Sequence, residues 1–136
     1  VQHYWADKET GDKLSKLDPS KIQIDFTNDG WTEDKSAETT ERNVFYYNSI
    51  LKKGQTSNDF TDKISISGDI AAIVGQTSQT DDNGLTTITT TYEYDGASFV
   101  LEATVDAVQT HNAEDAIKSA WGVDVNISDD GALSLE

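Results

Sequence analysis

The longest regular alternation of apolar and polar side chains lies in the stretch YEYDGASFVLEATVDAVQ, residues 92–109. Successive side chains of a β-strand point to opposite faces of the sheet, so this pattern predicts a long, half-buried strand. Its core-facing positions would be Phe99, Leu101, Ala103, Val105 and Ala107. Because these side chains shrink along the strand, we expect it to be a central strand beneath a second sheet that closes at one end, as in a β-sandwich.

Shorter segments predict further strands joined by turns. Residues 1–5 and 21–26 alternate, and Asn28-Asp29-Gly30 forms a tight turn before Trp31. Residues 43–51, 60–67 and 85–94 are also expected strands, and the turn at 81–84 joins the last of them to the polar run 76–80. Residues 32–42 are expected to form a polar loop, and the apolar run 70–74 fits a strand or a helical turn equally well.

One helix is predicted in NAEDAIKSAWG, residues 112–122. Asn112 is a good N-cap, acidic residues occupy the first turn, and Gly122 is placed to end the helix. The residues expected to dock the helix on a sheet are Ala113, Ile117, Ala120 and Trp121. The pattern as a whole predicts an all-β protein, residues 1–136 forming a single antiparallel β-sandwich of jelly-roll type with one short helix near the C-terminus.

Composition narrows the functional classes. The 136 residues include 10 basic and 25 acidic residues, for a net charge of -15, which argues against binding to nucleic acid or to anionic membrane surfaces. No apolar run reaches the roughly 18 residues of a membrane span. Cysteine is absent, which excludes disulfides and thiolate metal sites, and methionine is absent even at position 1, so we expect a processed chain.

Motifs for catalysis or cofactor binding are not found, so no catalytic, cofactor or metal residue is predicted. The histidines, His3 and His111, are far apart and form no HExxH motif, and the sequence holds neither a glycine-rich phosphate loop nor GxSxG. The acidic turns at 28–34, 81–84 and 129–131 offer oxygen ligands for calcium, but none matches an EF-hand loop. A Lys–Asn crosslink of the kind found in exported β-domains is also conceivable, although no spacing identifies one.

Three segments together suggest a family. VFYYNSILKKGQTSNDFTDKISISG (44–68) has an aromatic strand, a PGETT-like turn written here as Lys53-Gly54-Gln55-Thr56, then phenylalanine and an alternating strand. FVLEATVDAVQTHNAEDAIKSAWG (99–122) combines a strand ending in AVQ with a short helix ending in AWG, and LDPSKIQIDFTNDGW (17–31) precedes both. In this order they resemble the TasA and camelysin-like family of Gram-positive exported proteins, which are released by an alternate signal peptidase.

The function that the resemblance implies depends on strands that family members carry ahead of the segment corresponding to residue 1. Members of the family carry earlier strands, so this chain is expected to be the C-terminal part of a longer precursor, or to receive the missing strands from another copy. A sheet that lacks a strand leaves unpaired backbone beside an apolar groove. The resemblance therefore implies a non-enzymatic fibre subunit of the extracellular matrix or cell surface that self-associates by β-strand complementation, with a seam near Val1, His3 and Trp5.

Two alternatives remain open at the level of sequence. The first is a cell-surface binding module for a glycan or a partner protein, in which Trp31, Tyr46 and Tyr47 would form an exposed stacking platform rather than part of the core. The second is a protease, because camelysin-like proteins carry that annotation, although the metal motif is absent from this sequence.

Overall fold

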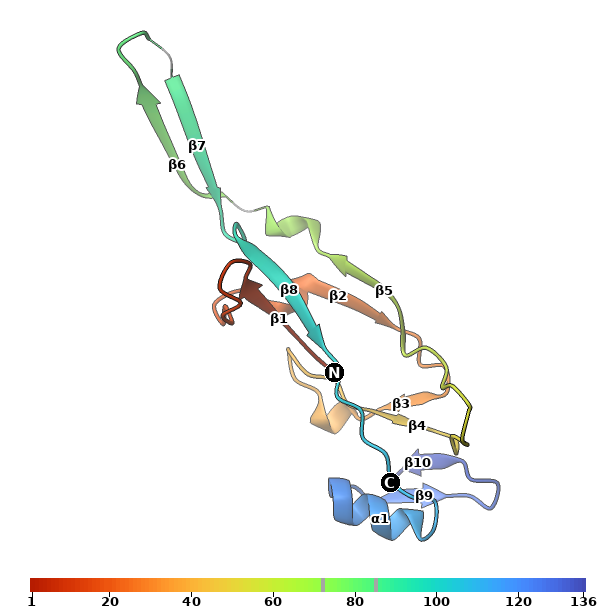
Figure 1. The fold of residues 1–136 in the computed structure, drawn as a ribbon. Helices are drawn as coiled ribbons and strands as arrows, with labels where there is room; N and C mark the ends of the chain where they lie inside the picture. Colours follow the sequence, from red (N-terminus) through yellow and green to blue (C-terminus); the bar gives the residue numbers. More distant parts are fainter. Residues whose placement is uncertain (72, 85) are drawn as a thin grey trace. The chain divides into compact units, whose positions relative to one another are not determined.

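The computed structural model describes residues 1–71, 73–84 and 86–136, and over these ranges the chain is all-β with one short helix (Figure 1). The elements, in order, are β1 (Gln2–Asp7), η1 (Pro19–Lys21), β2 (Ile22–Phe26), β3 (Trp31–Glu33), η2 (Lys35–Ala37), β4 (Phe45–Tyr47), β5 (Thr61–Ile66), η3 (Gly68–Ile70), β6 (Ile73–Thr80), β7 (Thr86–Tyr92), β8 (Ala97–Glu102), α1 (Ala113–Trp121), β9 (Val125–Ile127) and β10 (Leu133–Leu135). The predicted all-β class with a short helix near the C-terminus is confirmed.

The described strands form two-stranded sheets, namely β1–β8, β2–β5, β3–β4, β6–β7 and β9–β10. The chain divides into two compact units. Unit 1 contains Val1–Gln2, Ile24–Lys63 and Glu102–Glu136, and unit 2 contains His3–Gln23 and Ile64–Leu101. Jelly-roll connectivity stays a prediction, and each unit is described by itself below.

The core of unit 2 forms around Trp5 of β1. Its side chain is only 3% exposed, its ring packs against Tyr94 with centroids 5.0 Å apart, and its Nε1 donates a hydrogen bond to the Asp18 carbonyl. Ala6 and Ile22 are also buried. Because β1 pairs with β8 and Trp5 anchors the 3-10 turn η1, a few large side chains hold this unit together.

The hairpin β6–β7 also belongs to unit 2, and its turn was predicted correctly. Thr80 pairs with Thr86, and Asp81 closes the turn by accepting hydrogen bonds from Asn83 and Gly84. Such side-chain bonds explain why Asp and Asn favour tight turns.

Unit 1 combines an aromatic hairpin with the C-terminal helix. In β3–β4, Trp31 lies opposite Tyr47, and the ring of Phe45 packs on Phe26 at 4.6 Å between centroids. In α1, Ile117 is 2% exposed. A hydrogen bond from the Ile127 amide to the Glu114 side chain ties α1 to β9.

Several expectations about these elements are wrong. The strand predicted over 92–109 is broken by a turn after β7, and its second part, β8, ends at Glu102. Two side chains expected in the core are exposed, Phe99 by 41% and Val105 by 85%. The physical reason is that alternation only makes a face available for burial, and in the described chain these two side chains are not covered.

The structure also differs from the predictions for single residues and for the bounds of short segments. Asn112 precedes the helix as expected, but it has left-handed backbone angles and makes no side-chain cap bond, while Gly122 ends the helix as predicted. Ala120 is exposed rather than docked. The strand expected over 43–51 is confined to β4, the polar run 76–80 is part of strand β6, and the loop expected over 32–42 contains η2. Ala72 and Leu85, within the predicted segments 70–74 and 85–94, lie outside the described residues.

Candidate functional site

An open groove of about 530 Å³ lies in unit 1, between segments that are far apart in the sequence. One wall is the segment 42–46, where Val1 and Asn43 exchange backbone hydrogen bonds of 2.8 and 2.9 Å and Gln2 forms an antiparallel bridge with Arg42. The other wall is the segment 102–106. This volume falls in the range of roughly 300–1,000 Å³ that is usual for ligand-binding clefts.

The lining of this groove combines apolar and aromatic side chains with the charged residues Arg42, Glu102 and Asp106. It includes Val44 and Phe60, together with Trp121 from the end of α1, whose ring lies 5.7 Å from that of Tyr46. Burial, followed by the nearby charge of Asp34, raises the pKa of Tyr46, so its hydroxyl stays protonated at neutral pH. The sequence indicated apolar roles for several of these residues but gave no signal that they meet at one groove.

The wall formed by 102–106 begins at the last residue of β8 and continues beyond that strand. Residues 103–109 belong to no strand ladder of the described chain, yet their sequence continues the alternation of β8. Ala103, Thr104 and Asp106 are exposed, and Val105 is 85% exposed. An alternating segment that lies outside the strand ladders beside a groove is a candidate position for an added β-strand.

A second groove of about 360 Å³ in unit 1 holds residues of the predicted glycan platform. Trp31 and Tyr47 share one face of β3–β4, with ring centroids 4.8 Å apart and planes at 54°, and the Trp31 indole donates to the Asn58 carbonyl. Tyr46 points to the opposite face, because neighbouring side chains of a strand alternate. Ile50 and Leu51 on the rim are 47% and 50% exposed.

The residues predicted at the seam are not presented together. Val1 lines the 530 Å³ groove of unit 1. His3 and Trp5 belong to unit 2, where they are 7% and 3% exposed. The groove is therefore bordered by Val1, Gln2 and the segment 102–106, and the latter contribution was not predicted.

In unit 1, the Glu33 carboxylate lies near the first groove and makes polar contacts that hold a wall residue in place. Desolvation, the largest single influence, raises its pKa, but hydrogen bonds from Lys35 and Asn43 outweigh it and leave the pKa below its ordinary value. Since Asn43 lines the groove, the Glu33 carboxylate fixes the orientation of one wall residue.

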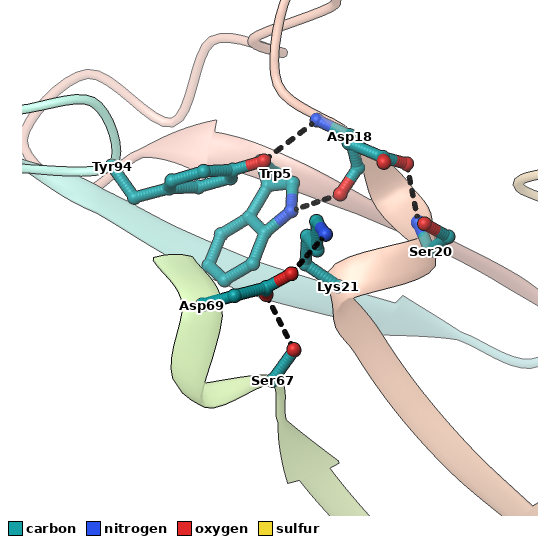
Figure 2. A network of polar contacts seen from close by, with 7 residues as sticks. All are labelled: Trp5, Asp18, Ser20, Lys21, Ser67, Asp69 and Tyr94. Atoms are coloured by element: carbon teal, nitrogen blue, oxygen red, sulfur yellow. Dashed lines mark hydrogen bonds and ion pairs between the residues drawn. The ribbon is translucent and has the colours of Figure 1, made fainter. Parts of the chain in front are cut away.

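Unit 2 contains a polar network around Asp18, Lys21 and Asp69 (Figure 2). The Asp18 carboxylate accepts from the Ser20 amide at 2.9 Å, and the Asp18 amide donates to the Tyr94 hydroxyl at 3.2 Å. Lys21 Nζ lies 2.6 Å from Asp69 Oδ2, and this contact raises the pKa of Lys21 and lowers that of Asp69. Both directions favour the charged pair, whereas an amide crosslink between these two groups would require a neutral amine.

Comparison with known proteins gives no assignment, since no family model, curated protein or solved structure matches the chain. Within the described ranges, no three His, Asp or Glu side chains are grouped so as to hold a metal ion. No helix in the same residues has the length and apolar character needed to cross a membrane. What the site offers is a groove of mixed polarity beside an alternating segment that lies outside the described strand ladders.

Proposed function

We propose that this protein is a non-enzymatic structural subunit of an extracellular matrix or cell-surface fibre. It assembles when a β-strand from a second copy pairs along residues 103–108 and places alternate side chains in the 530 Å³ groove. The observation that supports this most directly is Val105, an apolar side chain of an alternating segment that is 85% exposed beside the groove. The resemblance to TasA and camelysin-like exported proteins agrees with it.

The test is the mass in solution of the 136-residue chain and of two variants, measured by size-exclusion chromatography with light scattering. We expect the unaltered chain to form concentration-dependent oligomers. Val105→Lys should lose assembly through the groove and form no fibres, because it places a charge in the strand-binding edge, and its high exposure means that the chain should still fold. Ser134→Lys, an equal change of charge at an exposed position of β10 outside the groove, should assemble normally.

Two results would contradict the proposal. One is an unaltered chain that remains a folded monomer at millimolar concentration. The other is a Val105→Lys variant that assembles as readily as Ser134→Lys while both retain the same far-ultraviolet circular dichroism spectrum.

A binding module for glycans is the second candidate, favoured by the Trp31–Tyr47 ring pair on the 360 Å³ groove. Stacking on a sugar needs an accessible ring face, and both rings are half-buried. A glycan array probed with the Val105→Lys variant would support this candidate only if binding were lost on Leu51→Ala, at the exposed rim, with the fold retained.

A further inference from the structure

The hairpin β6–β7 of unit 2 is a second exposed sheet, independent of the groove. It pairs in register from Gln76↔Thr90 to Thr80↔Thr86, and no third strand adjoins it in the described chain. Described side chains from Gln76 to Thr80 and from Thr86 to Thr89 are all exposed. A two-stranded hairpin is marginally stable by itself in water, so these strands gain most from a further strand at their edge.

The charge distribution identifies what could approach this edge. Between residues 73 and 92, the charged residues are Asp81 and Asp82, both in the turn, whereas the whole chain carries a net charge of -15. Proteins usually protect sheet edges with charged residues, proline or a bulge. Neither strand contains a charge or a proline, so two copies of this acidic protein can meet here without bringing like charges together.

The two edges of the hairpin differ. The register of β6 shifts between Ile73 and Gly75, an irregularity that interrupts regular pairing along that strand. β7 carries TTITTTY, rich in β-branched residues that suit a pleated surface, and its Ile88 is 62% exposed. β7 therefore presents the better edge, together with an uncovered apolar side chain.

We propose that the β7 strands of two copies pair antiparallel across a twofold axis at Ile88, which forms a four-stranded sheet. In this register Ile88 faces Ile88 of the second copy, and Thr86 and Thr87 face Thr90 and Thr89. Threonine pairs and β-branched pairs stabilise antiparallel strands, and the apolar side chains cover each other. The contact is isologous, so the same surface serves both partners.

The absence of cysteine allows a direct test with single introduced thiols. Ile88→Cys would place two thiols opposite each other across the axis, within the Cα separation of roughly 4.4–6.8 Å that a disulfide requires. Ser78→Cys is the matched control, because Ser78 lies beside Ile88 on the same rung but on β6, one strand farther from the axis. Under mild oxidation, we expect Ile88→Cys to form covalent dimers at least tenfold faster than Ser78→Cys.

Equal rates of crosslinking at the two positions, or no dimer with Ile88→Cys while its thiol reacts freely with a small reagent, would overturn the inference. Both cysteine substitutions should also be made together with Val105→Lys, which blocks the groove. Position-specific crosslinking that persists in this variant supports the β7 contact independently of the proposed function. Assemblies of Ile88→Lys that match those of the unaltered chain in both fibre length and bundling would overturn the β7 contact alone.

If both contacts form, each subunit has two different partners, one through unit 1 and one through unit 2. Two separate contacts on one subunit generate an open chain when the operations do not close into a ring. The β7 contact would then act either within a fibre or between fibres, and electron microscopy of the Ile88→Lys variant would distinguish shorter fibres from unbundled ones.

Discussion

Gly30 shows how a single residue determines the local structure beside the aromatic hairpin. Its φ of 74° lies in the left-handed region, and it follows Asn28, which has a φ of 53°. A Cβ added at Gly30 would lie 3.1 Å from Tyr47 Cε2 and 3.2 Å from Asn58 Nδ2. The Asn-Asp-Gly turn was readable in the sequence, but the close approach of Tyr47 depends on packing that the sequence does not reveal.

Gly30→Ala should therefore destabilise the protein more than Gly54→Ala. Gly54 has a φ of 84° but no neighbour within 4 Å of an added Cβ, so alanine there should lower the free energy of unfolding by about 1–2 kcal/mol through backbone strain alone. At Gly30 the ring of Tyr47 must also move, and we expect roughly twice that loss. Urea denaturation followed by circular dichroism measures both, and equal losses would show that Tyr47 does not pack closely against the turn.

At the scale of elements, local chemistry and tertiary partners contribute differently. The turns at 28–30 and 81–84, the end of α1 at Gly122 and strand β2 were all predictable, because each depends on residues adjacent in sequence. The exposure of residues 99–107 could not be predicted, since alternation only makes a face available for burial and a second layer must cover it. The groove could not be predicted from the sequence either, because its walls come from three distant segments.

Helix α1 gives an element-scale prediction. Ile117 is 2% exposed, and Val125 of the adjoining β9 is 5% exposed. Ile117→Ala should lower the free energy of unfolding by about 2–5 kcal/mol, because it leaves a cavity where the helix is most deeply buried. Ser119→Ala, at an exposed position of the same helix, should change it by less than about 0.5 kcal/mol. A similar small loss for both variants in thermal denaturation would show that α1 is not packed as described.

At the scale of the whole molecule, the net charge of -15 opposes both compactness and association. Few buried apolar side chains of the described chain offset this repulsion. They are Trp5, Ala6, Ile22, Ile117 and Val125. The proposed β7 contact lies on strands without charged residues, whereas Glu102, Asp106 and Arg42 line the groove. Conditions that reduce the charge should therefore favour assembly, until they begin to disrupt the folded units.

Lowering the pH distinguishes the effect of charge on assembly from its effect on the stability of the folded units. Hydrogen bonds from Lys21 and then Ser67 lower the pKa of Asp69, the Ser20 side chain and amide lower that of Asp18, and the Ser128 hydroxyl lowers that of Asp130. Unfolded aspartates titrate near about 3.9, so below that pH the unfolded chain binds more protons than the folded one. The stability contributed by these carboxylates is thus complete above about pH 5 and is lost as the pH falls through the lowered folded-state values.

Between pH 7 and the isoelectric point of about 4.2, by contrast, acid removes repulsion while leaving most of these bonds intact. We expect the urea midpoint of the Val105→Lys variant to be highest near pH 5 and to fall steeply toward pH 3, while assembly of the unaltered chain is strongest near the isoelectric point. Asp69→Asn should flatten the acid limb, because asparagine does not titrate. A urea midpoint that peaked at the isoelectric point of about 4.2 instead of near pH 5 would mean that charge repulsion, rather than the bonds to these carboxylates, governs stability.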